Sequence, residues 1–339
     1  MANVAVIGAG AWGTALAIHS ARVGHSVRLW AREKEVVDAA AERRENTPFL
    51  PGMRLPDRVH VTGDGAEAVR DAELVILVPP SKFLRAVAGS LAAHVPREAA
   101  VVVASKGIEE STLELMKDVA AEAMPDVGPE RLAFLSGPNF AKEIAAGLPA
   151  DTVVASKDAV AAKRVQPLLH APTFRVYTSA DPVGVEVGGA LKNVIAVAAG
   201  ACDALELGNN ARAAIITRGL AEITRFGVAL GADPLTFLGL AGMGDLVLTC
   251  TGDLSRNRTL GMEVARGIDP DAYIASHRTV AEGWFTAHAA YDLAKKLDLD
   301  APICEQVYFV LHKKRPLLEA LHALMTRSMK DELRGIKAS

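Results

Sequence analysis

Hydrophobic and polar positions follow two different patterns along this chain of 339 residues. Up to about residue 180, short β-branched runs alternate with stretches of helical periodicity, and several runs are apolar at every position. Unbroken apolar strands are typical of a parallel sheet that helices cover on both faces. The predicted strands are residues 3–8, 26–32, 73–79, 99–107, 132–137, 151–156 and 174–179.

Beyond residue 180 no convincing strand pattern remains, and helical segments separated by Gly, Asn and Pro replace it. The expected helices cover residues 184–204, 210–229, 233–240, 256–266, 281–296, 302–312 and 316–325. The sequence therefore predicts an α/β, doubly wound, Rossmann-like domain over residues 1–180. An all-α domain over residues 181–339 follows it, and the helix at 184–204 begins that domain at the junction, where a cleft is expected.

Composition excludes several classes of protein. The net charge of -3 argues against nucleic acid or an anionic membrane as the main partner, since both select a basic surface. No uninterrupted apolar run approaches the ~18 residues of a spanning helix, so no stable membrane insertion is expected. Three widely spaced cysteines and an N-terminus without a basic signal region predict a cytoplasmic protein with no disulfide framework and no metal site.

A glycine-rich turn follows the first predicted strand. "VAVIGAGAWGTALA" places Gly8, Gly10 and Gly13 between a strand and a helix, the context in which this spacing binds the pyrophosphate of a dinucleotide. At the end of the second strand, "LWARE" has Ala31, followed by Arg32, where NAD sites usually carry an acid. Because a guanidinium suits a 2′-phosphate, NADPH/NADP is the preferred cofactor in this prediction. The adjacent Glu33 leaves NADH/NAD use open.

The stretch "GGALKNVIAVAAG" places one lysine among small and apolar residues. On a helix, Lys192 shares a face with small and apolar residues at 188, 189, 195, 196 and 199. A buried ammonium group needs a counter-charge or loses its proton. Asp245 is a candidate counter-charge, and a lysine with a lowered pKa is a competent general acid or base.

Three further motifs carry polar groups to the same region. Lys106 follows a predicted strand in "ASKG", and "SGPNF" carries Gly137 and Asn139, with Asn139 expected to cap a helix. In "TGDLSRNR", Ser255 is expected to cap a helix whose start makes an anion site. Taken alone, Lys106 fits a surface turn and Asn139 a plain cap equally well, and the spacing in the Ser255 motif favours a solvated capped loop. Together they favour a phosphate-binding site beside a hydride-transfer centre.

The motifs in their order resemble bacterial-type NAD(P)-dependent glycerol-3-phosphate dehydrogenase. The resemblance rests on "GAGAWGTALA", "ASKGIE", "SGPNFAKEIAAGLP", "GALKNVIAVAAG", "GDLVLTCTGDLSRNRTLG" and "VAEGWFTA". It implies interconversion of dihydroxyacetone phosphate and sn-glycerol 3-phosphate, a small phosphorylated substrate, for phospholipid synthesis. Asn139 departs from the family, in which serine or threonine is commoner at that place.

The resemblance also assigns roles to residues. Lys192 corresponds to the catalytic proton donor and acceptor, and Asp245 to the carboxylate that supports it. The implied substrate contacts are Lys106, Gly137, Asn139, Lys192, Asn193, Asp245, Thr249, Ser255, Arg256 and Asn257. The implied cofactor contacts are Gly8, Gly10, Ala11, Trp12, Gly13, Arg32, Phe49, Lys106, Ala141, Arg256, Val280 and Glu282.

Two alternative functions are weighed against this interpretation. Related two-domain dehydrogenases for hydroxy acids carry a lysine and an asparagine four residues apart on the corresponding helix. Here Asn193 is adjacent to Lys192 and position 196 is alanine, which disfavours that alternative. A nucleotide-sensing protein without catalysis would need no lysine, carboxylate and phosphate loop together. Assembly as a homodimer is left open by the sequence.

Overall fold

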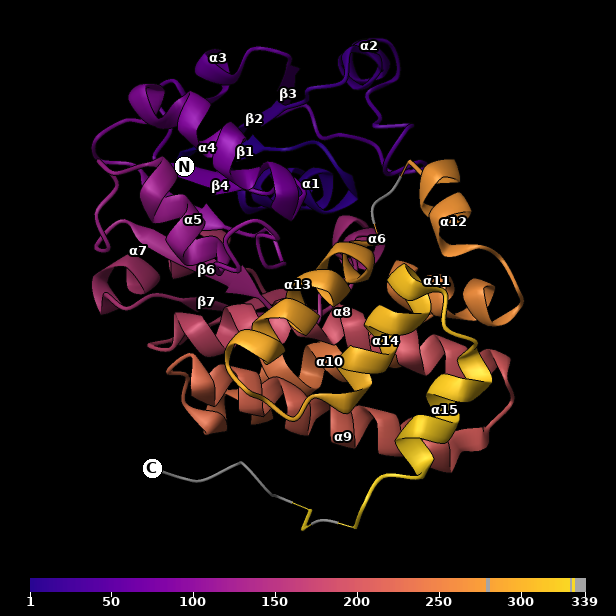
Figure 1. Cartoon of the computed structure of the whole chain (residues 1–339). Helices are drawn as coiled ribbons and strands as arrows, with labels where there is room; N and C mark the ends of the chain where they lie inside the picture. Colours follow the sequence, from indigo (N-terminus) through magenta and orange to yellow (C-terminus); the bar gives the residue numbers. More distant parts are fainter. Residues whose placement is uncertain (279–280, 330, 333–339) are drawn as a thin grey trace. The chain divides into compact units, whose positions relative to one another are not determined.

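Residues 1–278, 281–329 and 331–332 are described by the computed structural model, and the chain divides into two compact units. The first unit combines Met1–Ser105 with Met116–Pro182, and the second combines Lys106–Leu115 with the chain from Val183 onward (Figure 1). The short segment Lys106–Leu115 thus groups with the second unit, although the boundary predicted at residue 180 assigns it to the first.

The first unit is built on an eight-stranded sheet of order β3-β2-β1-β4-β5-β6-β7-β8. Its strands are β1 Asn3–Ile7, β2 Ser26–Trp30, β3 Val59–Thr62, β4 Leu74–Leu77, β5 Ala100–Val103, β6 Leu132–Ser136, β7 Ala150–Ala155 and β8 Phe174–Ser179. All seven predicted strands are present. The prediction of a parallel sheet is wrong at one junction, because β6 and β7 pair antiparallel while β7 and β8 pair parallel.

Helices cover both faces of this sheet, as the unbroken apolar strands predict. In β1, Val4 and Val6 join the core beneath α1, α2, α6 and α7, whereas Ala5 and Ile7 join the core beneath α3, α4 and α5. The helices are α1 Ala11–Val23, α2 Lys34–Arg43, α3 Gly65–Val69, α4 Leu84–Leu91, α5 Met116–Ala123, α6 Ala141–Ala146 and α7 Ala159–Leu169, with short 3₁₀ turns η1 Ser81–Phe83 and η2 Ala92–His94.

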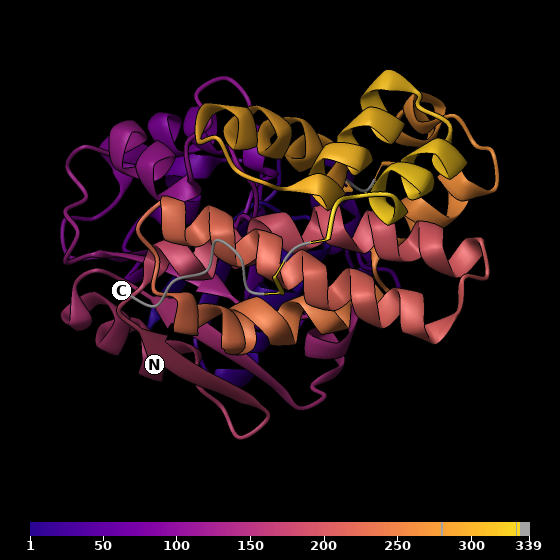
Figure 2. The same cartoon turned by 60° about the horizontal axis from the view of Figure 1, so that its bottom comes forward.

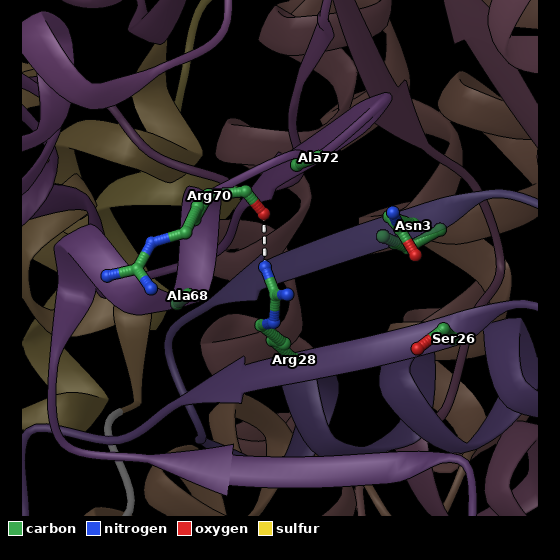
Figure 3. Close-up of a pocket in the computed structure, with 7 residues that line it drawn as sticks. Asn3, Ser26, Arg28, Ala68, Arg70 and Ala72 are labelled. Carbon is green, nitrogen blue, oxygen red and sulfur yellow. Dashed lines mark hydrogen bonds between the residues drawn. The ribbon is translucent and has the colours of Figure 1, made fainter.

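The carboxyl ends of the central strands meet at one edge. Ile7 of β1 is in register with Trp30 of β2 and Leu77 of β4, so the turns that follow these strands are neighbours. The opposite edge holds a hollow lined by Asn3, Ser26 and Arg28, among others (Figure 3). There Arg28 donates a hydrogen bond to the carbonyl of Arg70, which ties β2 to the turn after α3. This hollow therefore lies at the amino ends of the strands, away from the glycine-rich turn.

In the second unit, the described residues from Val183 onward form helices joined by turns, whereas Lys106–Leu115 is a loop closed by an isolated β-bridge between Ile108 and Leu115. Its helices are α8 Pro182–Ala204, α9 Gly208–Ala229, α10 Asp245–Thr251, α11 Arg256–Ala265, α12 Pro270–Ser276, α13 Glu282–Lys296, α14 Pro302–Lys313 and α15 Leu317–Met325. The segment predicted as a helix at 233–240 is a 3₁₀ turn, η3 Pro234–Leu238, followed by a π turn, η4 Leu240–Gly244. Helices α10 and α12 are seven residues each, too short to give a recognisable period, and the sequence pattern missed them.

Helix α8 forms the centre of this unit, and Figure 2 shows it alongside α9. By length and composition α8 is apolar enough to cross a membrane, although its sequence contains no long uninterrupted apolar run. In the most apolar 18-residue stretch of α8, 94% of the residues are buried inside the structure. Core helices of folded domains share this length and composition, and the apolar side chains of α8 belong to the core of the second unit.

The backbones of α8 and α11 touch where they cross. A Cβ atom on Gly261 would lie 1.9 Å from the Val197 carbonyl oxygen, and one on Gly200 would lie 1.9 Å from the Arg258 carbonyl oxygen. Neither position has room for a side chain. The reciprocal contact fixes the first turns of α11 against α8.

Gly261→Ala should therefore destabilise the protein by about 3 kcal/mol, because a methyl group must separate two packed helices. Chemical denaturation measures the change. Gly89→Ala in α4 is the matched control: its Cβ atom would come no closer than 3.9 Å to the Ala123 carbonyl oxygen. Alanine should raise stability there by about 0.5–1 kcal/mol. Equal stability of Gly261→Ala and the wild type would contradict the close crossing.

Candidate active site

A π turn brings a carboxylate to the face of α8 that carries Lys192. A Cβ atom on Gly188 would lie only 2.4 Å from the carbonyl oxygen of Ala241, so α8 runs directly against the backbone of η4. Asp245 follows η4 at once and opens α10. Since Gly188 and Lys192 are four residues apart on α8, the contact at Gly188 brings Asp245 to Lys192. Single π turns of this kind are frequent at functional sites.

Asp245 is the counter-charge of two lysines. Lys192 Nζ donates to Asp245 Oδ1, and Lys106 Nζ donates to Asp245 Oδ2 at 2.7 Å. Lys192 also donates to Thr249 Oγ1 at 2.9 Å, and the Thr249 hydroxyl donates to the Asp245 carbonyl at 2.6 Å. Lys192 and Asp245 are 7% and 1% exposed. The prediction that Lys192 is buried with Asp245 as its partner is confirmed.

The surroundings of Lys192 change its acidity. Burial lowers the pKa of the Lys192 ammonium from its ordinary value of 10.5 to about 8, opposed by the charge of Asp245 and assisted by the charge of Lys106. At neutral pH the group therefore holds its proton but releases it readily. This is the condition for a side chain that donates a proton in one direction of a reaction and accepts it in the other.

A pair of asparagines adjoins this centre. Asn257 Nδ2 donates to Asn193 Oδ1 at 2.8 Å, and Asn257 Oδ1 accepts from the Gly283 amide at 2.8 Å. The backbone donor at Gly283 fixes which way the Asn257 amide points. These bonds link α8, α11 and α13, and they leave one N–H of Asn257 for another acceptor.

The first turn of α11 begins as the sequence predicts. Ser255 Oγ accepts from the Arg258 amide at 3.2 Å, so Ser255 is the N-cap. Arg256, the first residue of the helix, is exposed, and nearby protein atoms lower the pKa of its guanidinium while Glu282 raises it. Solvent moderates that effect and the group keeps its charge. Arg258 instead pairs with Asp203 of α8 at 2.8 Å and serves the fold.

In the first unit, the backbone of the glycine-rich turn has the features of an anion-binding site. Gly8 adopts φ +123°, and a Cβ atom on it would lie 2.8 Å from the Val78 carbonyl oxygen. Helix α1 starts at Ala11 with no acidic residue in its first turn, so its positive end faces this turn uncompensated. The Trp12 indole Nε1 is buried and has no hydrogen-bond partner among the described residues. These features suit a pyrophosphate group.

Arg32 stands at the same edge, just after β2. Its side chain is 66% exposed, and its Nη2 lies 3.1 Å from Glu33 Oε1. Phe49 packs against the core beneath α1, and Ala141 opens α6. Glu282 opens α13 in the second unit. Val280 lies outside the described residues.

Asn139 does not cap a helix, so that prediction is wrong. The N-cap of α6 is Phe140, which uses no side-chain bond. Asn139 instead donates to the Asp151 carbonyl at 3.1 Å and accepts from Thr152 Oγ1 at 2.9 Å. Its amide ties the loop after β6 to β7. Gly137 lies in the same loop, and a Cβ atom added to it would lie 3.0 Å from Thr152 Cα. The antiparallel pairing of β6 and β7, which the sequence did not predict, makes these contacts.

Comparisons with known proteins identify the family of this chain. Family models described as the N-terminus and C-terminus of NAD-dependent glycerol-3-phosphate dehydrogenase match residues 3–162 and 181–322. The chain belongs to this dehydrogenase family.

Its relatives cover almost the whole length. A glycerol-3-phosphate dehydrogenase [NAD(P)+] of Geobacter sp. (strain M21) is 50% identical over 97% of this chain and 98% of that protein. One of Geobacter metallireducens is 51% identical over the same shares. The crystal structure of glycerol-3-phosphate dehydrogenase from Coxiella burnetii superposes with a TM-score of 0.91 at 35% identity, covering 96% of this chain and 99% of that one.

Sequence reasoning missed one residue that supports the glycine-rich turn. Asn46, which is fully buried, donates to the Ala9 carbonyl at 2.8 Å and to Thr14 Oγ1 at 2.7 Å. Its Oδ1 accepts from the Phe49 amide at 3.3 Å. An asparagine that follows a run of charged residues carries no local signal of such a role, because Ala9 and Thr14 lie more than 30 residues away in the sequence.

Asp245→Asn should lower the free energy of unfolding by about 3–5 kcal/mol at pH 7, because two lysines lose their counter-charge. The wild-type Lys192 pKa of about 8 falls further without the carboxylate. Lys192 of the variant therefore loses its proton at a lower pH than Lys192 of the wild type. Raising the pH from 7 to 9 then stabilises the variant more than the wild type, so the difference in their free energies of unfolding should shrink.

Urea unfolding at both pH values measures this difference. Asp253→Asn is the matched control, since Asp253 is 96% exposed where it meets Arg258 and should contribute little. A loss that is the same at pH 7 and pH 9 would contradict the assignment to a titrating buried lysine.

Proposed function

We propose that Lys192 is the proton donor and acceptor of the NAD(P)-dependent interconversion of dihydroxyacetone phosphate and sn-glycerol 3-phosphate. The observation that carries the proposal is a buried lysine of pKa about 8, held by a carboxylate that a second lysine shares. Within the family to which the chain belongs, this reaction supplies glycerol 3-phosphate for phospholipid synthesis.

In the reducing direction, Lys192 donates a proton to the C2 oxygen of dihydroxyacetone phosphate as that oxygen becomes an alkoxide. In the oxidising direction, the neutral amine takes the hydroxyl proton back. The bound nicotinamide supplies or accepts the hydride. Asp245 and Thr249 fix the position of Nζ, and Lys106 adds a second positive charge beside the developing oxyanion.

The phosphate end of the substrate fits the start of α11. Arg256 is charged and exposed there, and Asn257 keeps one N–H that its bonds to Asn193 and Gly283 do not use. The first amides of a ten-residue helix capped by Ser255 add a positive potential. We assign phosphate binding to these groups.

The turn from Gly8 to Gly13 would hold the cofactor pyrophosphate, and the buried Trp12 indole offers a donor beside it. Arg32 supports a preference for NADPH, since a guanidinium forms charge-assisted bonds with a 2′-phosphate. Glu33, which pairs with Arg32, offers a ribose hydroxyl an acceptor and supports the use of NADH as well.

For the setting of the enzyme we propose the cytoplasm, which the three buried thiols Cys202, Cys250 and Cys304 suit, and assembly as a homodimer. Light scattering tests the assembly: a homodimer has twice the mass of the 35.7 kDa chain.

Lys192→Met should lower turnover of dihydroxyacetone phosphate by about 10²–10⁴-fold, the usual contribution of a positioned acid. Loss of NADPH absorbance measures the rate. The variant should fold and bind NADPH normally, because Asp245 keeps Lys106 as its partner. Lys296→Met, at the exposed end of α13, is the matched control and should keep full activity. Near-normal turnover in Lys192→Met would remove the lysine from the mechanism.

The two directions should also depend on pH in opposite ways. Reduction needs protonated Lys192, so its turnover should fall as the pH rises through about 8. Oxidation of glycerol 3-phosphate needs the neutral amine, so its turnover should rise over the same interval. Profiles from pH 6.5 to 9.5 with saturating cofactor check this. Two profiles that change in the same direction would rule out one shared proton-transfer group.

A further inference from the structure

An exposed aromatic ring in the first unit lies close to two positive charges. Phe83 is 37% exposed, so one part of its ring is open to solvent. The Arg32 guanidinium carbon lies 5.4 Å from the centre of its ring, and Lys82 Nζ lies 5.0 Å from the same centre. Both distances are within the range of cation–π attraction.

The sheet topology brings these three residues together. Strands β2 and β4 flank β1, and all three run parallel (Figure 1). Arg32 follows β2 by two residues, while Lys82 and Phe83 belong to η1, which comes soon after β4. The cluster therefore lies at the carboxyl edge of the sheet, where Gly8 to Gly13 follow β1.

The position of the two cations beside one ring suits a ligand with several acceptor oxygens. Two cations near one ring repel each other, and the ring offsets that repulsion weakly. Glu33 brings a single negative charge to Arg32. A phosphate monoester carries nearly two negative charges at neutral pH and three acceptor oxygens, so it can accept from a guanidinium and an ammonium at once.

We propose that Lys82 is a second determinant of NADPH specificity and binds the 2′-phosphate jointly with Arg32. The Phe83 ring sets the spacing of the two cations. This inference rests on the proposed function and deepens it, because it names a residue of η1, far from Arg32 in the sequence, as part of the same 2′-phosphate site.

Binding of NADPH and NADH without substrate tests the proposal, with the fluorescence of the reduced nicotinamide as the readout. Lys82→Gln should weaken NADPH binding by about 10–100-fold and leave NADH binding within about twofold. Free 2′,5′-ADP should displace NADPH from the wild type and do so about 10–100-fold less well from the variant. Lys163→Gln, an exposed lysine of α7, removes the same charge elsewhere and should change neither affinity.

Arg32→Gln and the double variant complete a cycle. If both cations hold one phosphate, the double variant should lose less NADPH affinity than the product of the two single losses. Raising the salt concentration should weaken NADPH binding more in the wild type than in Lys82→Gln.

Three results would overturn the inference. Equal losses of NADPH and NADH affinity in Lys82→Gln would make the lysine a general structural residue. Unchanged NADPH affinity would remove it from the site, and in both cases the proposed function would stand. Failure of the wild type to bind either dinucleotide would overturn this inference and the proposed function together.

Discussion

The pairing of one buried carboxylate with two lysines is the interaction on which the chemistry of this protein depends. Asp245 is almost fully buried, yet both of its oxygens accept from ammonium groups of Lys192 and Lys106. Removing charges from water is costly, and the arrangement persists because every partner is in place. The same burial that makes the pairing costly lowers the pKa of Lys192 toward neutrality.

Close backbone packing in the second unit positions that carboxylate. Gly188 lets η4 approach α8, and Gly200 and Gly261 let α11 cross it in contact. The backbone of α8, which carries Lys192, thus packs directly against the segments that carry Asp245 and the proposed phosphate site. In the first unit, parallel strands bring the glycine turn, Arg32 and η1 to one edge of the sheet. Each unit therefore places its functional groups through its own topology.

Features with a local cause could be predicted from the sequence. The buried strands, the glycine turn, the cap at Ser255 and the unusual burial of Lys192 all follow from spacings within about ten residues. The features that the sequence did not predict depend on contacts between residues far apart in the chain. The antiparallel pairing of β6 with β7 gives Asn139 its bonds, and the packing of Lys106–Leu115 places that segment in the second unit. Strand β3 was missed because it is short and alternates with polar residues at the sheet edge.

Direct titration of Lys192 tests the central claim most closely. Lysine labelled with ¹³C at Cε reports its own protonation by chemical shift, and comparison with Lys192→Met assigns the signal. The account predicts a transition near pH 8, well separated from the ordinary lysines near 10.5. A Lys192 signal that does not move below pH 10 would show an ordinary surface-like ammonium group, and the proposed acid–base role would be wrong.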